Sequence, residues 1–227
     1  MEELKKVGRE ATKNILLKHG AREPLYGVKV EDLKKLQRKI KSNPALALQL
    51  YDTTIADAMY LAGLITHGSY MTKQQLQKWV EEAYWPMLSE YTVPKVAAEN
   101  IAGFELALEW IQSSTEHIAA AGWSTLAILA EKSNPEPNRE TLQSLLHKVK
   151  QTIHLSPNRV RYTMNGFIIA VGSYVHSLSG LAEETGRQIG KVTVDMGGTA
   201  CKVPYAPDYI QKVKEKKAGG KKRQEVN

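Results

Sequence analysis

The sequence SSTEHIAAAGWSTLAILAEK, Ser113 to Lys132, predicts the helix around which the rest of the chain packs. Ser113 and Glu116 have the spacing of a capping box, which predicts a helix start at Ser113. The residues that follow are apolar on nearly every face, which is typical of a helix buried on several sides. Gly122 lets neighbouring helices approach closely, and Trp123 supplies bulk. The segment is too short and too polar at both ends to span a membrane.

Helical periodicity continues on both sides of this segment. We expect a first helix over residues 3–19 and an amphipathic helix over residues 30–40, whose apolar positions follow helical spacing. Amphipathic helices alternate with nearly all-apolar ones, and the buried type recurs at residues 54–66, 116–130 and 160–178. This alternation predicts an all-α fold of stacked antiparallel helix pairs, in which each pair covers its neighbours' apolar faces. A non-repeating helical bundle is the alternative, because the period is not strict.

The C-terminal part departs from this pattern. We expect a helical domain over residues 1–190, an extended or turn segment over residues 191–209 packed on it, and a basic, partly disordered tail over residues 210–227. Within the extended segment, Asp195–Lys202 carries two adjacent glycines whose amides could cradle an anion. The same stretch could instead be a tight turn that docks the tail. Cys201 would need a partner group to act as a nucleophile.

Charge is unevenly distributed along the chain. The net charge of +7 divides into +6 for residues 1–41, −6 for residues 42–130, +2 for residues 131–209 and +5 for residues 210–227. Basic ends attract polyanions such as nucleic acids, although solvated lysine-rich helix ends explain the same pattern. The single cysteine excludes an internal disulfide and fits a reducing compartment, so we expect a cytoplasmic protein without a membrane segment.

Signatures of several enzyme classes are missing from the sequence. The histidines lack metal-ligand spacing, and there is no nucleophile elbow, phosphate loop or dinucleotide-binding glycine pattern. We therefore expect no metal and no cofactor. Arg159 and Arg161, which follow Lys148 and Lys150, are candidate phosphate contacts, with a solvated basic surface as the alternative.

Four segments together carry a resemblance to a known family. They are YGVKVEDLKKLQRKI (26–40), LYDTTIADAMYLAGLITH (50–67), GWSTLAILAEK (122–132) and MNGFIIAVGSYV (164–175). In this order they resemble the DNA alkylation repair enzymes with HEAT-like repeats, the alkylpurine DNA glycosylases. The resemblance implies an all-α superhelix of HEAT or ARM type whose basic concave face holds DNA. It also implies hydrolysis of the N-glycosidic bond of N3- or N7-alkylated purines.

The family's catalytic motif, Trp-x-x-x-Asp, is not found here. The order of helices places Val93 and Ala97 at its two positions, Ala120 at the later arginine and Phe167 at the second tryptophan. Glu99 is the only acid near the motif, so it is the candidate catalytic residue. The resemblance implies that aromatic side chains line the lesion, and the candidates for this wall are Trp123, Phe167 and Tyr26.

Three hypotheses follow for the function. The protein is an alkylpurine glycosylase that uses Glu99, a non-catalytic DNA-binding member of the family, or a helical-repeat protein whose acidic middle binds a protein partner. We expect it to act as a monomer on duplex DNA, including alkylated or otherwise damaged duplexes. The candidate DNA-backbone contacts are basic residues, namely Lys29, Lys34, Lys35, Arg38, Lys95, Arg159, Arg161, Lys191 and Lys202.

Overall fold

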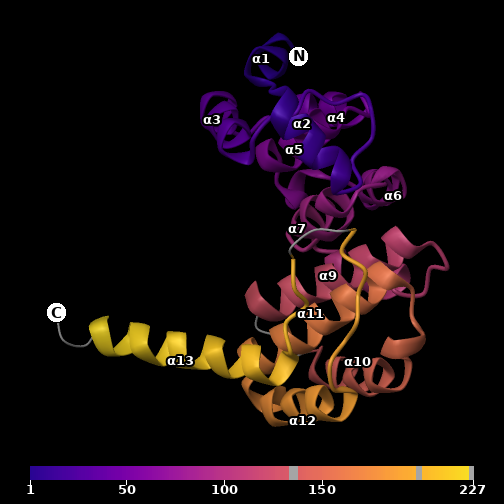
Figure 1. The fold of residues 1–227 in the computed structure, drawn as a ribbon, viewed down its shortest axis with the longest axis vertical. Helices are drawn as coiled ribbons and strands as arrows, with labels where there is room; N and C mark the ends of the chain where they lie inside the picture. Colours follow the sequence, from indigo (N-terminus) through magenta and orange to yellow (C-terminus); the bar gives the residue numbers. More distant parts are fainter. Residues whose placement is uncertain (133–137, 198–200, 225–227) are drawn as a thin grey trace. The chain divides into compact units, whose positions relative to one another are not determined.

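A computed structural model describes residues 1–132, 138–197 and 201–224 (Figure 1). Within these residues the regular structure is entirely helical, and no strand is present. No helix among them is long and apolar enough to cross a membrane. The chain divides into two compact units, and the division falls inside one helix. Unit 1 comprises Met1–Thr125 with Asp195–Cys201, and unit 2 comprises Leu126–Val194 with Lys202–Asn227.

Short helices build unit 1. They are α1 (Glu2–Val7), α2 (Glu10–Lys18), α3 (Val30–Ile40), α4 (Pro44–Tyr51), α5 (Ala56–Ile65), the 3-10 turn η1 (Gly68–Tyr70), α6 (Lys73–Glu82), the π-helical segment η2 (Met87–Thr92), α7 (Val93–Ala97), α8 (Gly103–Trp110) and the first part of α9 (Glu116–Lys132). Helix α5 packs on α3, on α4 and on η2, and α6 packs on α7. Stacked helix pairs are therefore the architecture of this unit, as the alternating sequence pattern predicts.

The core of unit 1 is aromatic as well as aliphatic. All four tryptophans of the chain are buried here, namely Trp79, Trp85, Trp110 and Trp123. The Tyr51 ring stacks on Trp79 with ring centroids 4.0 Å apart, and the Tyr51 hydroxyl donates to the Trp79 carbonyl oxygen at 2.7 Å. Burial raises the pKa of the Tyr51 phenol, so this hydroxyl remains a proton donor at neutral pH.

Unit 2 contains the rest of α9, then α10 (Arg139–Thr152), η4 (Ile153–Leu155), α11 (Asn158–Tyr174), η5 (His176–Leu178), α12 (Ser179–Ile189) and α13 (Ala206–Gln224). Helix α11 packs on α12 and α13, and α12 also packs on α10. Residues 191–197 have no regular secondary structure apart from a turn at Gly197, and α13 begins at Ala206, inside the segment expected over residues 191–209. Helix α13 includes residues 218–224, for which the sequence predicts disorder; residues 225–227 lie outside the described residues.

Two expected helix boundaries differ from the structure. The single helix expected over residues 3–19 is divided at Gly8, because Gly8 is extended (ψ 146°) and the Arg9 N–H donates to the Gly27 carbonyl oxygen at 3.1 Å instead of continuing the helix. Gly8 also lies against the Tyr26 backbone with no room for a Cβ atom. Helix α9 begins at Glu116 rather than at Ser113, because the Ser113 hydroxyl accepts from the Thr115 N–H and holds the preceding turn. The close packing expected at Gly122 is confirmed: a Cβ there would lie 2.8 Å from the Ala107 carbonyl oxygen of α8.

Candidate nucleic-acid interface

Asp57, in the first turn of α5, fixes the loop that leads into α3. Its carboxylate is buried and accepts backbone N–H groups from Tyr26 at 2.5 Å, Gly27 at 3.3 Å and Val28 at 2.8 Å. A carboxylate that accepts several amide hydrogens satisfies donors that the loop cannot pair internally. These bonds set the position at which α3 begins, just after Lys29.

Helix α3 carries the main group of basic side chains in unit 1. Its Leu33 and Leu36 are buried, whereas Lys34, Lys35 and Arg38 are exposed. Lys35 bonds to Asp32 at 2.7 Å, and this bond holds the pKa of the Asp32 carboxyl below its ordinary value. Lys29, at the helix start, lies 3.8 Å from the Glu31 carboxylate.

Other cations near the end of α3 have no carboxylate partner. Among the described residues, no carboxylate oxygen lies within 4.0 Å of Lys34, Arg38 or Lys41, and we call these three side chains the α3 cation group. Lys41 follows the last turn of α3 and has φ 63° and ψ −144°. Residues other than glycine adopt this backbone conformation only with strain. Unpaired cations on a surface attract anions more strongly than paired ones.

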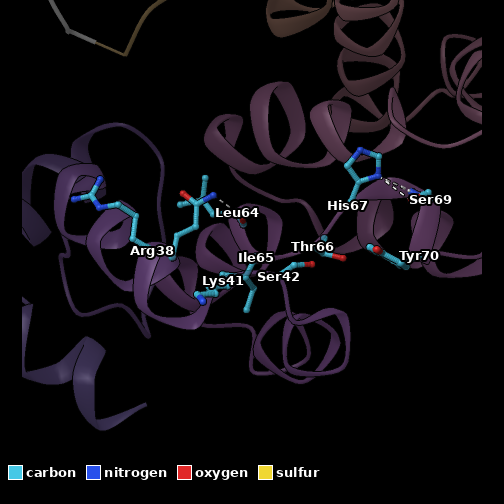
Figure 2. Close-up of a pocket in the computed structure, with 10 residues that line it drawn as sticks. Arg38, Lys41, Ser42, Leu64, Ile65, Thr66, His67, Ser69 and Tyr70 are labelled. Carbon is cyan, nitrogen blue, oxygen red and sulfur yellow. Dashed lines mark hydrogen bonds between the residues drawn. The ribbon is translucent and has the colours of Figure 1, made fainter.

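A hollow of about 690 Å³ lies between the ends of α3 and α5, and we call it the α3–α5 hollow. Its polar lining includes Arg38, Lys41, Ser42, Thr66, His67 and Tyr70. Leu64 and Ile65 add apolar surface, and the Gln37 amide donates to the Leu64 carbonyl oxygen at 2.9 Å, which ties α3 to α5. Figure 2 shows Arg38 and Lys41 on one side of the labelled group and His67, Ser69 and Tyr70 on the other. Of the residues that the structure describes, no aspartate or glutamate lines the hollow.

The turn after α5 forms the second side of the hollow. His67 Nδ1 accepts from the Ser69 N–H at 3.3 Å and lies 2.9 Å from Ser69 Oγ. His67 Nε2 lies 3.7 Å from the Glu99 carboxylate. Because Nδ1 accepts the Ser69 amide hydrogen, the geometry assigns the ring proton to Nε2, which faces Glu99. The Tyr70 ring is 64% exposed and lies edge-on to the His67 ring.

Glu99, the candidate catalytic acid, lies in the turn after α7. Its side chain is only 16% exposed, and it accepts the Gly68 N–H at 3.2 Å as well as facing His67. Asn100 completes the tie between the two turns, because its amide donates to the Gly68 carbonyl oxygen at 2.7 Å and to the Met71 carbonyl oxygen at 2.8 Å. These contacts give Glu99 a positioning role in η1, and its role as a catalytic acid stays a prediction.

The segment η2–α7, where the family's motif is expected, presents different side chains to solvent. Val93 and Ala97, the two positions matched to Trp-x-x-x-Asp, are fully buried. The exposed positions with the same four-residue spacing are Tyr91, at 50% exposed, and Lys95. An ammonium group at the second position cannot stabilise the positive charge that develops on a sugar during base loss.

The three candidate aromatic wall residues do not gather into one exposed surface. Trp123 and Phe167 are 0% exposed, in unit 1 and in unit 2 respectively, so neither ring offers a face to a nucleobase. Tyr26 is half-buried, and its backbone N–H is bonded to Asp57. The exposed aromatic residues Tyr70 and Tyr91 were not among the sequence candidates, and neither were Lys41 and His67 as binding residues.

The remaining basic candidates lie in unit 2. The Arg159 guanidinium lies over the Tyr162 ring, 4.5 Å from its centroid, and Arg161 donates to Asn158 at 3.5 Å. Lys191 and Lys202 are exposed. In the Asp195–Lys202 stretch, Asp195 accepts the Gly197 N–H at 2.9 Å and Gly197 has φ 64°, which is a turn; residues 198–200 lie outside the described residues. Within the described part of the chain, no three His, Cys, Asp or Glu side chains are grouped to hold a metal ion.

Comparison with known proteins identifies the class. The DNA alkylation repair enzyme family matches residues 1–178, and the chain belongs to this family. The chain is 34% identical over 220 residues to an uncharacterized protein of Listeria monocytogenes and equally to one of Listeria innocua. Each match covers 94% of this chain and 95% of the relative.

A solved structure supports the same class at the level of fold. It is described as belonging to a new family of proteins related to the HEAT-like repeat DNA glycosylases with affinity for branched DNA structures. The two chains superpose with a TM-score of 0.87 at 34% identity, covering 95% of this chain and 92% of the other. The all-α, HEAT-like repeat fold expected from the sequence is confirmed.

Proposed function

We propose that this protein binds DNA, with a preference for branched structures, through the basic surface of unit 1. The observation that carries the proposal is the α3 cation group, whose three side chains have no carboxylate partner among the described residues. Two of them, Arg38 and Lys41, line a hollow whose described lining has no acidic residue. Lysine and arginine contacts to phosphates supply most of the sequence-independent affinity for DNA. The described affinity of the structural relative for branched DNA supports the choice of DNA structure.

In the function proposed here, the protein binds DNA without excising a base. Excision of an alkylpurine requires a group that stabilises positive charge on the sugar, and the exposed pair on η2–α7 is Tyr91 and Lys95. Glu99 is held in the turn contacts described above. Lys95 serves instead as a further phosphate contact. Lys29 and Lys35, which pair with Glu31 and Asp32, contribute less to the salt dependence. The proposed setting is the cytoplasm, for which the single cysteine, Cys201, is the supporting observation. The proposed oligomeric state is a monomer.

The test is the salt dependence of binding to a four-way DNA junction and to a linear duplex of the same length. A triple variant, Lys34→Ala with Arg38→Ala and Lys41→Gly, removes three candidate phosphate contacts. Since each contact contributes about −0.9 to the slope of log affinity against log salt, the slope should become shallower by about 2.7. Binding should weaken on both DNAs.

A matched control removes three lysines that have carboxylate partners. Lys6 pairs with Glu3 at 3.1 Å, Lys78 pairs with Asp52 at 2.7 Å, and Lys73 pairs with Glu109 at 2.7 Å. Their replacement by alanine changes the net charge equally but should leave the slope nearly unchanged. Equal slopes for the two triple variants would refute the proposed surface.

Base excision is tested separately with excess wild-type protein on methylated duplex DNA at low salt. Release of methylated purines should not exceed the spontaneous rate. Release above that rate would contradict the non-catalytic assignment and would make Glu99→Gln the first variant to measure.

A further inference from the structure

The α3–α5 hollow has more features than phosphate contacts require. One side carries Arg38 and Lys41, the opposite side carries His67 and the exposed Tyr70, and Ser42 and Thr66 lie between them (Figure 2). Its volume of about 690 Å³ is within the range of roughly 300–1,000 Å³ typical of small-ligand sites. We infer that the hollow binds an unpaired nucleotide of a branched or gapped DNA strand, with its base stacked on Tyr70 and its phosphate on Arg38 and Lys41. This inference rests on the proposed function.

Tyr70 is exposed on a turn whose backbone is held by hydrogen bonds and close packing. The η1 turn that carries it is held by both carbonyl bonds from Asn100 and by the Gly68 N–H bond to Glu99. Gly68 lies so close to α7 that a Cβ atom would overlap the Val96 carbonyl oxygen. The backbone that carries the ring is therefore held before a ligand arrives, so binding has to order only the side-chain torsions of Tyr70.

The ring face selects for an unpaired base. Within a duplex both faces of a base are covered by neighbouring base pairs, so an aromatic side chain reaches them only where the stack is interrupted. Stacking on aromatic side chains tolerates every base, because each has a π face. Among the described residues the lining offers hydroxyl groups and two cations but no carboxylate, and the nearby Glu99 carboxylate faces His67, so the Arg38–Lys41 side attracts phosphate.

The geometry also separates two contributions to binding. Arg38 and Lys41 act on any DNA backbone, whereas Tyr70 acts only where an unpaired base is available. Loss of the Tyr70 ring should therefore reduce the preference for interrupted DNA, while loss of the cations should reduce binding to all DNA.

The experiment uses the full chain and a duplex with a short single-stranded gap that contains one 2-aminopurine. The same duplex without the gap is the reference. Wild-type protein should change the 2-aminopurine fluorescence on binding and should prefer the gapped DNA. Tyr70→Ala should lose the fluorescence change and weaken gapped-DNA binding by about tenfold, within the range for loss of one stacked base, with the affinity for intact duplex unchanged.

Two further variants keep the test specific. Tyr70→Phe retains the ring and should behave as wild type. Tyr209→Ala removes an exposed tyrosine from α13 in unit 2 and should also behave as wild type. If Tyr70→Ala retains the fluorescence change and the gap preference while the α3 triple variant loses binding, the nucleotide site is refuted and the proposed function stands. If wild-type protein binds neither DNA, both are refuted.

Discussion

Replacement of Asp57 by alanine should destabilise unit 1 more than the same replacement at any exposed carboxylate residue. The change leaves the N–H groups of Gly27 and Val28 buried without an acceptor, and that of Tyr26 partly buried. Each buried group without a partner costs about 1–3 kcal/mol, so the two buried ones together cost about 2–6 kcal/mol. This is a large share of the roughly 5–15 kcal/mol by which a typical domain is stable.

Urea unfolding followed by circular dichroism gives the loss of stability, and native-state hydrogen exchange gives its location. The amide hydrogens of Tyr26, Gly27 and Val28 should lose protection first. Asp52→Ala is the control, because Asp52 is exposed and pairs only with Lys78, so its loss should cost less than about 1 kcal/mol. A loss below about 1 kcal/mol for Asp57→Ala would refute the assigned role of these bonds. Asp57→Asn, which keeps one carbonyl acceptor, provides a smaller step if the alanine variant does not fold.

Other predictions concern the surroundings of the α3–α5 hollow. Lys41→Gly should raise the unfolding free energy by about 1 kcal/mol, because glycine adopts its backbone angles without strain, while DNA affinity falls; an unfolding free energy lower than wild type would contradict the strain. Gly68→Ala should cost about 1–3 kcal/mol and abolish the gap preference, because the methyl group overlaps the Val96 carbonyl oxygen. Asp32→Asn should be less stable than wild type at pH 6, since the bond to Lys35 lowers the pKa of Asp32 in the folded state. That stability is present above the unfolded pKa of about 3.9 and is lost as the pH falls through the lower folded value. The difference in stability between the two proteins should therefore shrink below about pH 4. A difference in urea midpoint that stays constant with pH would argue against the pairing.

The fold was predictable because it depends on local patterns repeated along the chain. The apolar spacing within residues 30–40 identifies α3 with its bounds, and Gly122 marks the close contact with α8. The division at Gly8 was not predictable, because it depends on the Tyr26 backbone, which only the tertiary structure brings near. A glycine that relieves such a contact has the same local sequence signal as a glycine tolerated within a helix.

The candidate site was predictable in part. The basic character of α3 follows from composition, so Lys34 and Arg38 were among the candidates. Side-chain geometry decides which lysines have a carboxylate partner. Lys35 bonds to Asp32, whereas Lys34 has no such partner among the described residues. Tyr70 was missed because the contacts that hold its turn come from Asn100, far along the chain. Trp123 was selected for its residue type, but its position inside a nearly all-apolar helix already favoured burial.

The distribution of tryptophan has a practical consequence for spectroscopy. All four indole rings lie within Met1–Thr125, and unit 2 contains none. Tryptophan emission therefore reports mainly on unit 1, whereas the helical signal of circular dichroism comes from both units. Coincident transitions by the two methods would show that the units unfold together, and separated transitions would show an intermediate in which one unit remains folded. A thermal shift assay based on emission would detect a ligand of unit 1 and would miss a change confined to unit 2.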